Sequence, residues 1–140
     1  MTKSSHRDTR VEVVPTGGPL GAEIRGVDLS KELSEATFRT IKSAWHDHLL
    51  VLIRDQRLTD DDIVAFGRRF GDLHSASGFE YGGKPKELPD PVELISNIVR
   101  GGRPIGALGA DEATWHTDMS MFDIPASATM LYAEEIPDSG

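Results

Sequence analysis

The sequence predicts an α+β fold, and three observations support this class. Two segments carry the apolar spacing of amphipathic helices, short β-type runs surround them, and Gly- and Pro-rich stretches separate the elements. The chain has 140 residues, of which 38% are hydrophobic and 27% are charged, so it has the size and composition of an ordinary globular domain. Residues 1–10 are polar and predict a disordered tail, which leaves 11–140 as the structured region.

The first helix is expected to follow two short strands. Residues 11–14 and 22–29 are β-type runs, and a turn of Thr, two Gly and Pro lies between them. Ser34 is a suitable N-cap for a helix whose apolar residues recur every three or four positions, at Phe38, Ile41, Trp45 and Leu49. The continuous apolar run at 50–53 predicts a strand that is buried on both faces.

The second helix has clear start and stop signals. Thr59 is the expected N-cap, and three Asp residues fill the first turn, where the helix dipole favours negative charge. The apolar stripe is Ile63, Phe66 and Phe70. Arg68 and Arg69 fill the last turn, and Gly71 is expected to end the helix.

The rest of the chain is expected to be mostly loops. Residues 72–91 and 99–113 are rich in Gly and Pro, and such long loops are often binding loops. Strands are predicted at 92–98 and at 128–134.

Composition excludes several classes of function. The net charge of −8, from 15 basic and 23 acidic residues, disfavours a general nucleic-acid binder. With no cysteine, the chain has no disulfide, thiolate zinc site, iron–sulfur cluster or cysteine nucleophile. No apolar run approaches the length of a membrane span, and residues 1–10 lack a signal-peptide core, so we expect a cytoplasmic protein without a membrane partner.

The segment Trp115-His116-Thr117-Asp118 contains the strongest chemical signal. In an extended segment, side chains two positions apart project to one face, so His116 and Asp118 would converge. They supply one His and the carboxylate of the two-His-one-carboxylate triad that holds non-haem Fe(II). On spacing alone, a structural hydrogen bond between the two side chains is an alternative interpretation.

Other residues suggest a different metal site. His46 and His48 lie in the last turn of the first helix, where cations are favourable, and His74 follows the second helix. Any of these three His residues could complete a zinc site for hydrolysis. Imidazole and carboxylate groups bind Zn²⁺ as well as Fe(II), so the ligand types do not distinguish the two metals.

Four ordered segments carry a resemblance to a known family. They are Pro19-Leu20-Gly21-Ala22-Glu23-Ile24 with Gly26-Val27-Asp28-Leu29, then Leu52-Ile53-Arg54-Asp55-Gln56, then Phe70-Gly71-Asp72-Leu73-His74, and then Trp115-His116-Thr117-Asp118. Together they resemble the taurine dioxygenase/phenoxyacetate dioxygenase (TauD/TfdA) family of Fe(II)- and 2-oxoglutarate-dependent oxygenases, from residue 11 to residue 140.

The resemblance implies a double-stranded β-helix, or jelly roll, with flanking helices, and it implies that His116 and Asp118 are iron ligands. The reaction would use Fe(II), 2-oxoglutarate and O2 to hydroxylate a small, anionic organic molecule, with release of succinate and CO2. The second iron-binding His, and the Thr and Arg that hold 2-oxoglutarate, are expected downstream of Gly140. We therefore expect residues 11–140 to be the N-terminal part of one dioxygenase domain, which is inactive alone and forms a homo-oligomer when complete. The alternative is a truncated, non-catalytic jelly-roll domain that lacks a complete metal site.

In this family, two loops line the substrate pocket, here residues 74–81 and 97–113. The resemblance therefore indicates substrate contacts at His74, Phe79, Tyr81 and Asn97, with positive charge available from Arg100 and Arg103. Trp115 is expected to pack against the wall of the site. Ala76 and Glu112 stand where taurine-using members carry a His and an Asn, which disfavours a taurine-like substrate.

Overall fold

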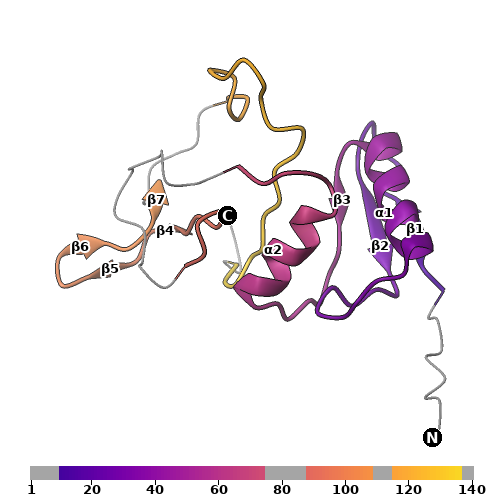
Figure 1. Cartoon of the computed structure of the whole chain (residues 1–140), viewed down its shortest axis with the longest axis horizontal. Coiled ribbons are helices and arrows are strands. Elements are labelled where there is room, and N and C mark those ends of the chain that lie inside the picture. Colours follow the sequence, from indigo (N-terminus) through magenta and orange to yellow (C-terminus); the bar gives the residue numbers. More distant parts are fainter. Residues whose placement is uncertain (1–9, 75–87, 109–114, 137–140) are drawn as a thin grey trace, which may run out of the picture. The chain divides into compact units, whose positions relative to one another are not determined.

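The structure is a computed structural model that describes residues 10–74, 88–108 and 115–136 (Figure 1). The predicted tail therefore lies outside the described residues, except for Arg10. The chain divides into two compact units, residues 1–62 and residues 63–140. Each unit is described by itself.

The first unit contains a three-stranded sheet and helix α1. Strand β1 (Glu12–Pro15) pairs antiparallel with β2 (Ala22–Arg25), and β2 pairs in parallel with β3 (Val51–Leu52). The strand predicted at 22–29 is therefore shorter than expected. Gly21 and Ala22 donate backbone hydrogen bonds to the carbonyl groups of His48 and Leu50, which attach the chain after α1 to the sheet.

Helix α1 (Glu35–His48) confirms the predicted start. The Oγ of Ser34 accepts a hydrogen bond from the backbone N–H of Thr37 at 3.1 Å, as an N-cap does. Leu49 adopts the left-handed conformation with φ of 65°, and its N–H donates to the carbonyl of Trp45. Because Leu49 leaves the helix at this point, its side chain is 70% exposed and does not extend the apolar stripe as predicted.

The core of this unit lies between α1 and the sheet. The helix packs against β2 and β3. The buried residues are apolar and come from both layers: Ala22, Ile24, Phe38, Ile41 and Ala44. Ile41 has no exposed surface.

The prediction of a strand buried on both faces at 50–53 is wrong. Strand β3 contains only Val51 and Leu52, and the side chains of Leu50 and Leu52 are 57% and 45% exposed. The reason is that β3 is at the edge of the sheet, with β2 as its neighbour.

Gln56 connects the chain after β3 to the loop after β2. Its Oε1 accepts a hydrogen bond from the N–H of Leu29 at 2.8 Å. Its Nε2 donates to the carbonyl groups of Val27, at 3.2 Å, and Arg54, at 2.9 Å. One side chain thus satisfies backbone groups on two segments that are far apart in the sequence.

Helix α2 (Asp60–Arg68) also begins as predicted. The Oγ1 of Thr59 accepts from the N–H of Asp62 at 3.2 Å, and Asp62 Oδ2 accepts from the N–H of Thr59 at 2.8 Å, which is a reciprocal cap. Phe66 is buried and stacks edge-to-face with Phe70, but the second buried residue is Val64 instead of Ile63. The helix ends at Arg68, and tighter backbone hydrogen bonds continue the turn to Phe70.

The second unit contains two small sheets. Strand β4 (Ile95–Ser96) pairs in parallel with β7 (Ala107–Leu108), and β5 (Val99–Arg100) pairs antiparallel with β6 (Arg103–Pro104). The strand predicted at 92–98 is thus reduced to two residues. The prediction of a loop at 99–113 is wrong for 99–108, because Gly101 and Gly102 adopt φ of 57° and 76° and close a two-residue hairpin between β5 and β6.

The strand predicted at 128–134 does not form. Residues 128–134 have no regular secondary structure, and none of the described segments pairs with them. Alternating apolar residues make a strand only where a neighbour accepts its backbone hydrogen bonds. The described part of the chain combines helices with small sheets, as an α+β class requires, and the jelly-roll arrangement stays a prediction.

Neither of the described helices has the length and apolar character that crossing a bilayer needs.

Candidate metal centre

His116 and Asp118 converge as predicted. The Nε2 atom of His116 lies 3.0 Å from Oδ1 of Asp118, and both side chains are about half exposed, at 60% and 48%. Two donor atoms of the types that iron prefers are therefore side by side and accessible from solvent.

The segment that presents the two side chains is not paired as a strand in the part of the chain that the structure describes. His116 and Thr117 have no regular structure, and a turn begins at Asp118. Met119 adopts the left-handed conformation with φ of 57°, and its carbonyl accepts a hydrogen bond from the N–H of Phe122. The chain thus turns immediately after the carboxylate, whose Oδ1 lies 3.0 Å from Nε2 of His116.

Thr129 holds the other oxygen of the carboxylate. Its Oγ1 donates a hydrogen bond of 2.7 Å to Oδ2 of Asp118, eleven residues earlier in the chain. This hydrogen bond lowers the pKa of Asp118 from its ordinary value, and the contact with His116 adds to the effect. The carboxyl group is therefore kept ionised, which is the form that binds a metal.

Trp115 does not line the wall of a site as we expected. Trp115 is 105% exposed, so none of the residues that the structure describes packs closely against it. The neighbouring Glu112 lies outside the described residues.

His74 is exposed and contacts the segment that follows the His-x-Asp motif. Its ring lies 5.0 Å from the ring of Phe122, centroid to centroid, in an edge-to-face arrangement. The loop after α2 therefore meets the turn after Asp118, which is the juxtaposition that a substrate role for His74 requires.

For the other predicted substrate residues that the structure describes, no hydrogen bond, ion pair or ring contact with the segment around Asp118 is observed. Asn97 is exposed between β4 and β5, and Arg100 and Arg103 face one another across the hairpin that follows. Phe79, Tyr81 and Ala76 lie outside the described residues. His74 is therefore the predicted substrate residue, among those that the structure describes, whose ring contacts the segment after Asp118.

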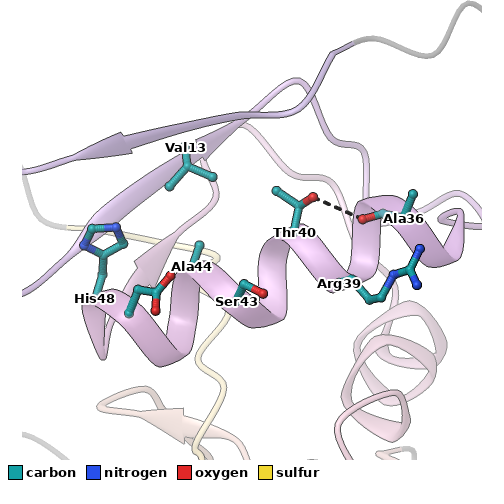
Figure 2. A pocket seen from close by; sticks show the side chains of 8 residues that line it. Val13, Ala36, Arg39, Thr40, Ser43, Ala44 and His48 are labelled. Carbon is teal, nitrogen blue, oxygen red and sulfur yellow. Dashed lines mark hydrogen bonds between the residues drawn. The ribbon is translucent and has the colours of Figure 1, made fainter.

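The zinc interpretation gains no support from the described residues. Within 10–74, 88–108 and 115–136, no group of three His, Asp or Glu side chains is arranged to hold a metal ion. His48 instead borders an open groove between α1 and β1 (Figure 2). The groove is lined by Val13, Ala36, Arg39, Thr40, Ser43, Ala44, Asp47 and His48.

Comparison with known proteins identifies the family. Residues 12–140 match the family described as "Taurine catabolism dioxygenase TauD, TfdA family", so this chain belongs to the TauD/TfdA family. The family predicted from the four ordered segments is thereby confirmed.

The chain is similar to several curated proteins of this kind. It is 33% identical over 132 residues to pentalenolactone F synthase of Streptomyces arenae, covering 93% of this chain and 43% of that protein. It is 33% identical over 135 residues to the alpha-ketoglutarate-dependent sulfate ester dioxygenase of Pseudomonas putida, covering 93% and 39%. It is 27% identical over 142 residues to the (S)-phenoxypropionate/alpha-ketoglutarate-dioxygenase of Delftia acidovorans, covering 94% and 44%. The chain thus spans about two fifths of the length of these relatives.

The residues present fit the iron that the family implies. Two ligands at right angles on an octahedral metal, with bonds of about 2.1 Å, have donor atoms about 3.0 Å apart. The Nε2 and Oδ1 atoms show this separation, which is also that of an ordinary hydrogen bond. An imidazole and a carboxylate are two of the three donors of a two-His-one-carboxylate Fe(II) site, and the hydroxyl group of Thr129 is an outer partner of the carboxylate.

Proposed function

We propose that the protein is an Fe(II)- and 2-oxoglutarate-dependent dioxygenase that hydroxylates a small anionic organic substrate and releases succinate and CO2. The observation that carries the proposal is the 3.0 Å approach of His116 Nε2 to Asp118 Oδ1 in a chain of the TauD/TfdA family. The names of the relatives support the co-substrate, because two of them are alpha-ketoglutarate-dependent dioxygenases.

In this proposal, the two residues hold the metal in different ways. His116 would bind through its ring nitrogen Nε2 and Asp118 through its carboxylate oxygen Oδ1, and the hydrogen bond from Thr129 lowers the pKa of Asp118, which favours the ionised carboxylate. When bound, the iron, 2-oxoglutarate and O2 supply the oxidation: one oxygen atom enters succinate as CO2 is lost, and the other enters a C–H bond of the substrate. The protein binds and orients the reactants and limits access of water.

The substrate is proposed to be anionic because of His74 and the relatives. An imidazole N–H at this position can donate a hydrogen bond to a carboxylate or sulfate group. Its ring contact with Phe122 ties the His74 loop to the turn that follows Asp118. Relatives are named for phenoxypropionate, 2,4-dichlorophenoxyacetate and sulfate ester, all of which carry an acidic group.

The test measures 2-oxoglutarate consumption and succinate release by the full natural protein, with and without Fe(II). The substrate panel contains phenoxyalkanoates, alkyl sulfates and their neutral ester or alcohol analogues. We expect Fe(II)-dependent turnover with an anionic member, and loss of turnover to background in His116→Ala and Asp118→Ala.

The control is Thr40→Val, which removes a hydroxyl group that donates to the carbonyl of Ala36 on α1 (Figure 2). This variant should turn over like the parent protein. Unchanged turnover in His116→Ala and Asp118→Ala would overturn the ligand assignment. No metal binding by the parent protein would favour the non-catalytic alternative.

A further inference from the structure

Thr129 was not singled out by the sequence, and its hydroxyl group contacts one of the two proposed iron ligands. Its Oγ1 lies 2.7 Å from Oδ2 of Asp118, while Oδ1 of the same carboxylate faces His116 at 3.0 Å. The two oxygens of Asp118 therefore have different partners. One is held by a hydroxyl group, and the other is directed at the imidazole.

This arrangement restricts the rotation of the carboxylate. Without a second partner, a half-exposed Asp side chain rotates about its Cβ–Cγ bond and presents either oxygen. A charge-assisted O–H···O⁻ hydrogen bond favours one orientation and leaves the lone pairs of Oδ1 directed towards Nε2 of His116.

The residue after Thr129, Met130, lies near helix α2. A Cβ atom added to Gly67 of α2 would lie 3.7 Å from Cε of Met130, which is ordinary van der Waals contact, and 3.1 Å from Cδ2 of Leu73, which is tighter. The segment that carries Thr129 therefore contacts α2 next to Gly67.

We infer that Thr129 is a positioning residue that orients Asp118 for metal binding. The inference rests on the proposed function, because it assigns Thr129 a role towards the metal ligand. Outer partners of metal ligands typically change metal affinity by about 10–100-fold when they are removed. The contact is made through a single hydroxyl group, so it can be removed with little change in side-chain volume.

The test is the metal affinity of the full natural protein, measured by anaerobic titration with Fe(II) and, as a spectroscopic probe, Co(II). Thr129→Val keeps the shape of the side chain and removes the hydroxyl group. We expect its dissociation constant for the metal to rise about 10–100-fold. The Co(II) absorption band should also change, because the orientation of one ligand is no longer restricted.

Thr129→Ser keeps the hydroxyl group and should bind metal within about threefold of the parent protein, well short of the loss expected without an outer partner. Thr40→Val is the matched control for loss of a Thr hydroxyl group, and it should leave metal affinity unchanged. If Thr129→Val does not fold, the comparison is made between Thr129→Ala and Thr129→Ser, whose metal affinities should differ by the same factor.

Three results would overturn the inference. Parent-like metal affinity in a folded Thr129→Val protein would show that the hydrogen bond does not orient the ligand, although the proposed function would stand. Equal losses in the Ser variant and in the Val or Ala variant would assign the effect to packing of the methyl group. Absence of metal binding by the parent protein would reject the proposed function and, with it, any role of Thr129 towards the metal.

Discussion

The two compact units of the chain differ in what holds their key residues in place. In residues 10–62, backbone hydrogen bonds join β1, β2 and the segment after α1, and apolar side chains from the helix and the sheet form the core. In residues 63–136, the described strands are two residues long, and 115–136 contains neither helix nor strand. There the carboxylate of Asp118 is held by side-chain contacts, with Thr129 at 2.7 Å and with His116 at 3.0 Å.

The difference indicates where stability and chemistry reside. The first unit has the regular packing from which most folding free energy comes. The motif segment instead exposes large apolar side chains, with Ile124 and Leu131 87% and 78% exposed. We therefore expect substitutions in the first unit to change the free energy of unfolding, and substitutions around Asp118 to change metal binding.

The largest expected effect on stability is at Ile41. Ile41→Ala removes a completely buried side chain from the contact between α1 and the sheet, and such a change typically costs about 2–5 kcal/mol. Ile124→Ala, at an 87% exposed position, should stay within about 0.5 kcal/mol of the parent protein. Urea unfolding of the natural protein checks both values. Similar losses at the two positions would contradict the division into a packed unit and an exposed motif segment.

A smaller effect is expected at Gln56. Gln56→Met has nearly the same volume and removes the hydrogen bonds to Leu29, Val27 and Arg54. Because these partly buried backbone groups lose their partner, the free energy of unfolding should fall by about 1–3 kcal/mol. Urea unfolding measures this change in free energy, and hydrogen exchange at the N–H of Leu29 reports on the loop itself. Unchanged protection of that N–H would mean that Gln56 does not hold the loop.

The smallest effect is a pH dependence at Asp28. The carboxylate accepts hydrogen bonds from Lys31 and Ser30, which lower the pKa of Asp28 from 3.8 to about 2. A pKa that is depressed in the folded state stabilises the protein above the unfolded value and ceases to do so as the pH falls through the folded value. The difference in Tm between the parent protein and Asp28→Asn should therefore be constant above pH 5 and shrink between about pH 4 and pH 2.

Since Asp28 is on the surface, this difference in Tm should be small and should weaken in high salt. A difference that stays the same down to pH 2 would show that Asp28 has no shifted pKa in the folded state.

Features that depend on neighbouring residues in the sequence were predicted well. Ser34 and Thr59 cap the two helices as expected, because a cap is made between residues three positions apart. The approach of His116 to Asp118 was also predicted, and the segment that carries the two residues is not paired as a strand. The hairpin at Gly101 and Gly102 was missed, although two successive Gly residues between short β-type runs are a known signal for it.

Features that depend on distant partners were predicted less well. The run at 50–53 was expected to be buried, and its exposure follows from the edge position of β3, which no local pattern specifies. The segment 128–134 has the composition of a strand, but pairing requires a neighbour that sequence periodicity does not identify.

By itself, the sequence determined the two helices, the pair of proposed iron ligands and, through four ordered segments, the family. Only the tertiary structure decided which residues support those ligands. Thr129 is eleven positions from Asp118 in an irregular segment, where no period relates one side chain to another. Its contact with the carboxylate exists only where the folded chain brings residues 118 and 129 together, so it is a property of the tertiary structure.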